Sequence, residues 1–242
     1  ANEGVKWETS EQLNVGIDAR FINSRLSLTA DWYIKKTKDW LVQAPVLATA
    51  GTQGPVINGG DVKNTGIELG LSWNDNIGKD FTYNVGANFA YNKNEVGSIP
   101  TEDGIIHGAS NQIYSNAEEF YRAENGHAIG YFWGFKTAGI FQNQQEINDW
   151  IAAGNGVMQS NVQPGDTKYV DVNHDGAINA SDKVDLGNGL PKYTFGFNLS
   201  LGYKGFDLSA NFTGAAGFQI AQSYRDPNSS QGNYSRAILD RW

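Results

Sequence analysis

The chain has 242 residues, enough for one or two ordinary domains, and its 18 basic against 26 acidic residues give a net charge of −8. This acidic balance argues against a phosphate-binding surface, so we expect no nucleic-acid partner. There are no cysteines, which excludes disulfide staples and thiolate metal sites. The 29 glycines and the 12% aromatic content are typical of an all-β protein with many turns.

No run of about eighteen consecutive apolar residues is present, so the sequence predicts no transmembrane helix. A mean hydropathy of −0.46 still allows a membrane barrel, because only alternate residues of a strand face lipid. The first residues, Ala1 to Gly4, lack the basic and apolar regions of a signal peptide, and the chain stops at Trp242 without a turn or cap. We therefore expect a fragment of a longer protein.

Apolar and polar residues alternate along six segments, the period of two that predicts β-strands. Short polar or glycine-containing links join them in pairs, at 23–25, 75–80 and 204–205, as in hairpins. In each segment one face is apolar or aromatic and the opposite face is polar or glycine. The six segments are 13–21, 26–35, 67–74, 81–92, 193–203 and 206–213.

The links between hairpins are long. Segments 37–63, about 93–190 and 215–242 lose the alternation and are expected to be loops. Within the longest, Tyr131–Phe141 is predicted to be extended and Gln142–Ala152 to form a short amphipathic helix. Short turns on one side and long loops on the other are typical of outer-membrane barrels, whose turns are periplasmic and whose loops are extracellular.

Strand length and aromatic placement favour a transmembrane antiparallel β-barrel over a soluble β-sandwich with one face in a core. Strands of about ten residues suit a bilayer, whereas sandwich strands usually have about five or six. Aromatic residues lie near the strand ends, where the interfacial girdles of a barrel belong. They are Trp73, Phe81, Tyr91, Tyr193, Tyr203 and Phe206.

Residues 171–182 match the twelve-residue EF-hand calcium loop. The expected ligands are oxygen-bearing groups at positions 1, 3, 5, 7, 9 and 12: Asp171, Asn173, Asp175, the Ala177 carbonyl, Asn179 and Asp182. Gly176 permits the sharp turn, and Ile178 is expected to anchor the loop. Because no helix pair flanks it, bound Ca²⁺ would be a structural clamp. The alternative is a loop closed by its own Asx-turns without metal.

The sequence predicts no enzyme. His107, His127 and His174 lack metal-ligand spacing, and there is no nucleophile elbow or phosphate loop. Glu118, Glu119 and Glu124 are interpreted as a solvated acidic face. Aromatic residues of segment 131–135 suit either sugar stacking or packing between loops.

Three segments together resemble the C-terminal barrel region of SusC/RagA-family TonB-dependent transporters: 126–147, 164–217 and the closing RAILDRW at 236–242. Segments 64–73 and 81–96 fit the same family. The combination of the calcium-like loop with the P-x-Y-T-F-G hairpin is the specific part, and the resemblance covers nearly the whole chain.

The resemblance implies active nutrient uptake across the outer membrane of Bacteroidetes-type bacteria by a 22-stranded barrel with a plug. It implies TonB as energy source, a SusD-like lipoprotein as partner, and a glycan or sometimes a peptide as substrate. Residues 1–242 would then form a C-terminal portion of the barrel, embedded in outer-membrane lipid. No substrate-binding residue carries over by motif. A secreted β-sandwich carbohydrate-binding module and a passive porin remain the alternatives.

Overall fold

The computed structural model describes residues 4–43, 51–223 and 236. The chain divides into two compact units. The wall unit comprises Ala1–Ile106, Ala123–Ile129 and Asn188–Ile220, and the loop unit comprises His107–Arg122, Gly130–Gly187 and Ala221–Trp242. The predicted loop 215–242 lies largely outside the described residues.

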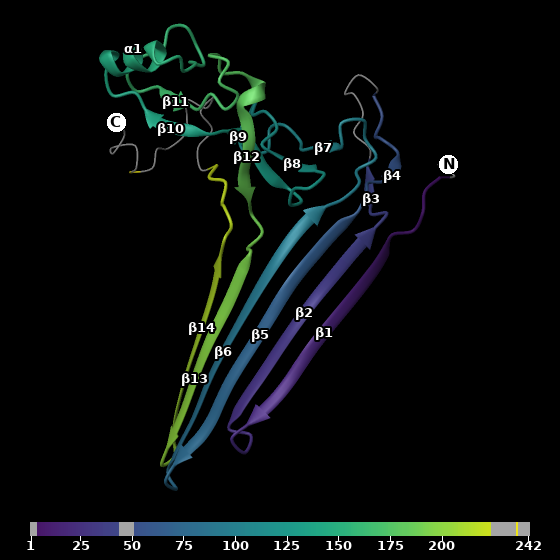
Figure 1. The fold of residues 1–242 in the computed structure, drawn as a ribbon, viewed down its shortest axis with the longest axis vertical. Helices are drawn as coiled ribbons and strands as arrows, with labels where there is room; N and C mark the ends of the chain where they lie inside the picture. Colours follow the sequence, from purple (N-terminus) through teal and green to yellow (C-terminus); the bar gives the residue numbers. More distant parts are fainter. Residues whose placement is uncertain (1–3, 44–50, 224–235, 237–242) are drawn as a thin grey trace. The chain divides into compact units, whose positions relative to one another are not determined.

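The wall unit contains one antiparallel sheet of long strands in the order β1-β2-β5-β6-β13-β14, which Figure 1 shows side by side. All six predicted strands are confirmed, and most extend further than the alternation indicated. The strands are β1 (Thr9–Phe21), β2 (Leu26–Lys38), β5 (Val62–Ile77), β6 (Phe81–Val96), β13 (Tyr193–Tyr203) and β14 (Phe206–Ala216).

Strands β6 and β13 are direct neighbours although about a hundred residues separate them. Their register pairs Tyr91 with Tyr193 and Phe81 with Tyr203. The long excursion between them therefore leaves and rejoins the sheet at adjacent positions. Within the described residues β1 pairs only with β2 and β14 only with β13, so the sheet has two open edges and the barrel is not closed within this chain.

The hairpin turns lie together at one end of the sheet (Figure 1). The turn predicted at 75–80 is shorter than expected, because β5 continues to Ile77 and pairs Ile77 with Phe81. Gly78 and Gly205 have φ of 65° and 86° in their turns, a conformation that costs glycine nothing. The first turn instead has three non-glycine residues with positive φ, from Ile22 to Ser24.

The antiparallel register aligns the apolar residues of all six strands on one face of the sheet. One row across the sheet joins Ala19, Leu28, Leu71, Ala87, Phe197 and Phe212. Many of these side chains are exposed; Leu71 is 49% and Phe212 61% accessible. Soluble monomers rarely expose so continuous an apolar surface.

Aromatic rows border this apolar face at both ends. At one end the Tyr91 and Tyr193 rings lie 5.4 Å apart, with Trp32 two strands further along the same row. At the other end Phe81 lies 6.4 Å from Tyr203, which pairs with Phe206. Tyr203 lies ten residues after Tyr193, about 33 Å along β13, and a strand of this length tilted by about 35–45° spans about 25 Å, the height of the apolar band of an outer-membrane barrel.

The buried core of the wall unit lies beyond the outer strand ends and not on the sheet face. Val96, Ile99 and Ala123 form it, with Trp40, Ile106 and Ile129 packed against them. Segment 37–63, predicted as loop, also contains a small hairpin of β3 (Leu41–Gln43) and β4 (Val56–Asn58). A β-sandwich would bury one face of the long strands, and this sheet does not.

The remaining strands are short. One sheet has the order β12-β9-β8-β7, formed by β12 (Lys183–Asn188), β9 (Tyr131–Phe135), β8 (Tyr121–Glu124) and β7 (Ile105–His107). A second pairs β10 (Thr137–Ile140) with β11 (Thr167–Tyr169). The extended segment predicted at 131–141 and the predicted helix are confirmed.

The helix, α1 (Gln144–Ala152), begins after Asn143, whose side chain accepts the Glu146 N–H as an N-cap. It buries Ile147 and places Trp150 against Phe141 at 6.0 Å. Among the described residues, no helix has both the length and the apolar character needed to cross a membrane.

Candidate functional site

The calcium-like loop lies in the loop unit between β11 and β12. Its first residue, Asp171, is only 4% exposed. One carboxylate oxygen accepts the Gly176 N–H at 2.7 Å and the other accepts the Asp175 N–H at 3.3 Å. Gly176 has φ of 83°, so it supplies the sharp turn that the motif predicts.

Asp182, the last residue of the loop, is fully buried. Its carboxylate accepts the Asn179 N–H at 2.8 Å and the Val172 N–H at 2.9 Å. The Asn179 N–H lowers the pKa of Asp182 most, and the Val172 and Asn173 N–H groups reinforce it against the opposing effect of burial. Asp182 is therefore held in its ionised form and ties both ends of the loop together.

The other predicted ligands make local contacts. Asn173 donates to an Asp175 carboxylate oxygen at 2.9 Å, and Asp175 accepts the Ala177 N–H at 2.9 Å. Asn179 caps the short 3-10 helix Ala180–Asp182. Ile178 is 8% exposed and anchors the loop as predicted.

The structure thus brings Asp171 and Asp182 together, and hydrogen bonds within residues 171–182 close the loop. Over the ranges that the structure describes, no three His, Cys, Asp or Glu side chains gather as a group able to hold a metal ion. The oxygen ligands still suit a hard cation. Each carboxylate oxygen can accept from two directions, and a hydrogen bond from one N–H occupies only one of them. Two buried carboxylates at the ends of one loop also favour a cation between them.

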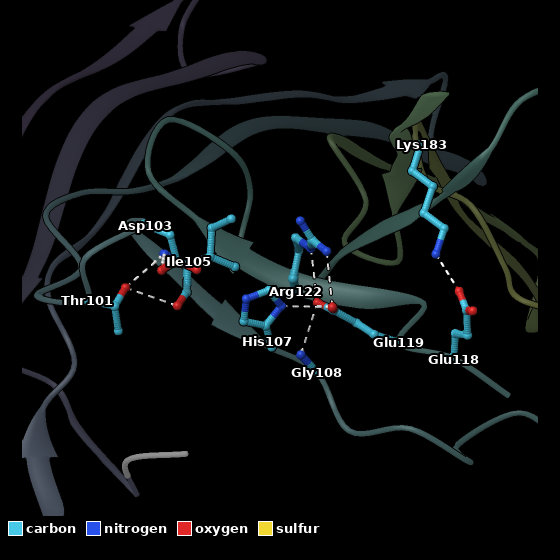
Figure 2. A network of polar contacts seen from close by, with 9 residues as sticks. All are labelled: Thr101, Asp103, Ile105, His107, Gly108, Glu118, Glu119, Arg122 and Lys183. Carbon is cyan, nitrogen blue, oxygen red and sulfur yellow. Dashed lines mark hydrogen bonds and ion pairs between the residues drawn. The ribbon is translucent and has the colours of Figure 1, made fainter. Parts of the chain in front are cut away.

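A second polar network, which the sequence did not predict, centres on Glu119 (Figure 2). Arg122 donates to both oxygens of Glu119, from Nε and from one terminal nitrogen, at 3.0 Å each. His107 Nδ1 lies 2.8 Å from one oxygen, and the Gly108 N–H donates to the other at 3.2 Å. Glu119 therefore fastens the segment at 107–108 to β8.

Burial of Glu119 opposes its ionisation, but hydrogen bonds from His107 and Arg122, with the Arg122 charge and the Gly108 N–H, hold the pKa of Glu119 below its usual range. Glu119 is 19% exposed, so the solvated acidic face expected at this position is wrong for it. The expectation is correct for the neighbouring Glu118, whose side chain is 79% exposed and pairs with Lys183.

The aromatic residues of segment 131–135 are used in packing. Arg122 covers the Trp133 ring at 4.1 Å, and Phe132 stacks on Phe120 at 5.8 Å. Tyr131 is fully buried. Of the two readings left open by the sequence, packing between loop segments accounts for these rings.

The loop unit also contains a cavity of about 280 Å³ beside β11. Phe141, Val157, Met158 and Val162 supply apolar lining and Asp166 a carboxylate. No pattern in the sequence predicted this cavity, because most of its lining comes from an irregular segment without periodicity.

The polar face of the wall sheet carries amides that bond across strands. Asn84 donates to Asn74, and Asn198 donates to Asn84 at 2.9 Å, so one chain of amides crosses β5, β6 and β13. Asn92 and Asn94 both donate to Asn64 nearer the other end, at 3.3 and 2.9 Å. The opposite face of the sheet is apolar, so the sheet has one apolar face and one polar face.

Residues 1–237 match the model of the family described as TonB dependent receptor-like, beta-barrel. The sheet, its register and this match agree, and the chain belongs to that family.

Two relatives illustrate the likeness. TonB-dependent receptor P3 of Formosa agariphila is 30% identical over 244 residues, covering 100% of this chain and 24% of the relative. TonB-dependent receptor SusC of Bacteroides thetaiotaomicron is 27% identical over 244 residues, covering 98% of this chain and 22% of the relative. The chain therefore spans about a quarter of the length of the curated relatives it matches.

Solved structures give the same result. The RagAB peptide transporter superposes with a TM-score of 0.65 at 25% identity, covering 87% of this chain and 21% of that one. The RagAB peptide importer in its closed-closed state gives a TM-score of 0.66 at 25% identity, covering 90% and 22%. The fold is that of a SusC-like barrel portion.

Proposed function

We propose that the chain forms part of the wall and outer loops of a transporter that takes up an oligomeric nutrient across the bacterial outer membrane. The observation that carries the proposal is the exposed apolar face of the six-stranded sheet, bordered by aromatic rows about 33 Å apart. Lipid is the solvent that suits such a face. Polar amides and hydroxyls on the opposite face suit a hydrophilic interior.

The open edges of β1 and β14 support the same proposal. Each presents a row of backbone N–H and C=O groups to the medium that covers the apolar face. In hydrocarbon every such group needs a partner, which only further strands of a closed barrel supply. This requirement disfavours a self-standing soluble β-sandwich module.

Energy from TonB and a SusD-like surface lipoprotein as partner are the remaining parts of the proposal. Relatives with the name TonB-dependent receptor support the first, and the two-component RagAB transporter supports the second. The substrate is proposed to be an oligomer, a glycan or a peptide; RagAB carries the description of a peptide importer. A passive porin is the competing function.

Uptake measurements test the proposal. Deleting the gene should abolish accumulation of one labelled oligosaccharide or peptide from a panel, and complementation with the full-length gene should restore it. A protonophore should stop accumulation, because TonB draws on the proton gradient. Accumulation that persists with the protonophore would identify a porin, and unchanged uptake after deletion would contradict the proposal.

We also propose that loop 171–182 binds Ca²⁺ as a structural clamp. The buried carboxylates of Asp171 and Asp182 are the supporting observation, and the Asn173, Asp175, Asn179 and Ala177 oxygens complete the proposed ligand set. Bound Ca²⁺ would supply a compensating charge and stiffen the loop.

Limited proteolysis of the full-length protein tests the calcium proposal. Chelator should speed cleavage within 171–182 and added Ca²⁺ should reverse it, whereas an Asp171→Asn variant should be cleaved rapidly in both conditions. Asp149→Asn, a change of an exposed acid on α1, is the control and should behave as wild type. Equal cleavage of wild type with and without chelator would contradict calcium binding.

A further inference from the structure

The cavity beside β11 has the size of a site for one small group. Its volume of about 280 Å³ lies at the lower end of ligand-binding pockets, enough for one residue or ring of an oligomer but not for the whole. All of its lining belongs to the loop unit. The lining residues are Phe141, Gly156, Val157, Met158, Gln159, Val162, Gly165, Asp166, Thr167 and Tyr169.

Asp166 gives this cavity a negative charge. Its Oδ2 accepts the Gln163 N–H at 2.8 Å and the Gln159 amide at 3.0 Å. Among the described residues Asp166 forms no ion pair, and its Oδ1 accepts no hydrogen bond. The nearby Lys168 is engaged by Glu146, so it does not neutralise the carboxylate.

The rest of the lining is mixed, with polar groups from Gln159, Thr167 and Tyr169 beside one apolar patch. Phe141 is 1% exposed, with Trp150 against it at 6.0 Å and the Lys168 ammonium 5.3 Å from its ring centre. Its faces are therefore not open to stacking, the usual contact for a sugar. Met158, 44% exposed, instead offers a flexible apolar surface, to which Val157 and Val162 add.

We propose that this cavity binds the amino-terminal residue of a short peptide with an apolar first side chain. The ammonium group would donate to Asp166 Oδ1, and the side chain would pack against Val157, Met158 and Val162. A charge-assisted hydrogen bond beside an apolar wall selects this chemistry over neutral hydroxyls. The inference rests on the proposed uptake function and narrows its substrate class to peptides.

Calorimetric titration of the full-length protein in detergent tests the inference with two probes, Leu-Ala-Ala and its N-acetyl form. We expect the free amine to bind about tenfold more tightly than the acetylated peptide, which corresponds to one hydrogen bond to a charged group. Asp166→Asn should lose about the same factor for the free amine. This variant keeps one oxygen to accept the Gln163 N–H, so the cavity should retain its shape. Asp149→Asn is the control and should bind as wild type.

A second variant, Val162→Phe, fills the cavity without changing its charge and should weaken both probes. Equal binding of the two probes would overturn the inference, and so would an Asp166→Asn variant that binds the free amine as wild type does. Unchanged affinity of the Val162→Phe variant for the acetylated peptide would also overturn it. Uptake in cells is measured separately. Protonophore-sensitive uptake that is indifferent to Asp166→Asn leaves the proposed function standing and refutes the cavity, whereas amine-selective binding without uptake does the reverse.

Discussion

Glycines on the polar face of the wall sheet make room for side chains of neighbouring strands. A Cβ at Gly66 would lie 2.5 Å from the Tyr33 hydroxyl and 2.5 Å from the Tyr91 carbonyl oxygen. A Cβ at Gly70 would meet only the Thr29 hydroxyl, at 2.4 Å. A hydroxyl can rotate away, but a carbonyl in the sheet ladder cannot, so the two glycines differ in how much change they tolerate.

Gly66→Ala should therefore destabilise the sheet by about 1–3 kcal/mol, the usual cost of overpacking. Denaturant unfolding of the full-length protein in detergent measures it. Gly70→Ala, four residues away on the same face of the same strand, should cost clearly less. Equal losses for the two variants would show that the Tyr91 carbonyl is not the obstacle.

Glu119→Gln should lower the stability of the loop unit by about 2 kcal/mol, because the buried Arg122 loses its charged acceptor. Glu118→Gln removes the adjacent, exposed carboxylate and should cost close to nothing. Hydrogen exchange of the backbone around 107–122 measures both. Comparable loss of protection in the two variants would contradict the central place of Glu119.

The lowered pKa of Glu119 also predicts a pH dependence. A carboxyl group whose folded pKa lies below its unfolded value near 4.5 stabilises the fold above that value, and the stabilisation is lost as the pH falls through the folded pKa. Hydrogen exchange at 107–122 should therefore accelerate, relative to the rest of the loop unit, below about pH 4. In Glu119→Gln this extra acceleration should be absent.

At the scale of elements, periodicity decided what the sequence could predict. Each long strand has one apolar face and one polar face, so its alternation is visible in the sequence and all six strands were predicted. The ends of strands were missed, as at Ile77, because the last residues pair with the neighbouring strand but do not alternate between apolar and polar. The Glu119 network was also missed, since His107 of β7 reaches Glu119 only through tertiary folding and the nearby Arg122 shows no pattern that predicts its ion pair.

The calcium-like loop was predicted in its turn and its anchor, because its spacing is local, whereas the burial of its two end carboxylates was not predicted. The internal hydrogen bonds that close it were the alternative interpretation, and spacing alone does not choose between metal and N–H groups. The cavity around Asp166 lay beyond sequence reasoning altogether, as its lining is brought together by tertiary folding.

The apolar face of the sheet predicts a sharp asymmetry between neighbouring residues of β5. Leu71, midway between the aromatic rows, should face the middle of the bilayer, and Leu71→Arg should cost about 2–4 kcal/mol. Ser72→Arg places the same side chain on the polar face and should cost far less. The fraction of folded full-length protein recovered from outer membranes checks both variants, and equal recovery would contradict the assignment of the two faces.

For the whole molecule, the two open sheet edges and the quarter-length match to relatives lead to one account. We propose that the chain supplies six strands to a larger closed wall, with the excursion between β6 and β13 outside the cell and the hairpin turns on the periplasmic side. The uptake and binding proposals both depend on this orientation.

Cysteine labelling in intact cells tests the account most directly, because the chain has no cysteine of its own. Two single variants of the full-length protein, Gln144→Cys on α1 and Lys79→Cys in the turn after β5, are treated with a membrane-impermeant maleimide. The account predicts that Gln144→Cys is labelled in intact cells and that Lys79→Cys is labelled only after the outer membrane is permeabilised. Labelling of Lys79→Cys in intact cells, or recovery of the protein in a soluble fraction, would contradict it.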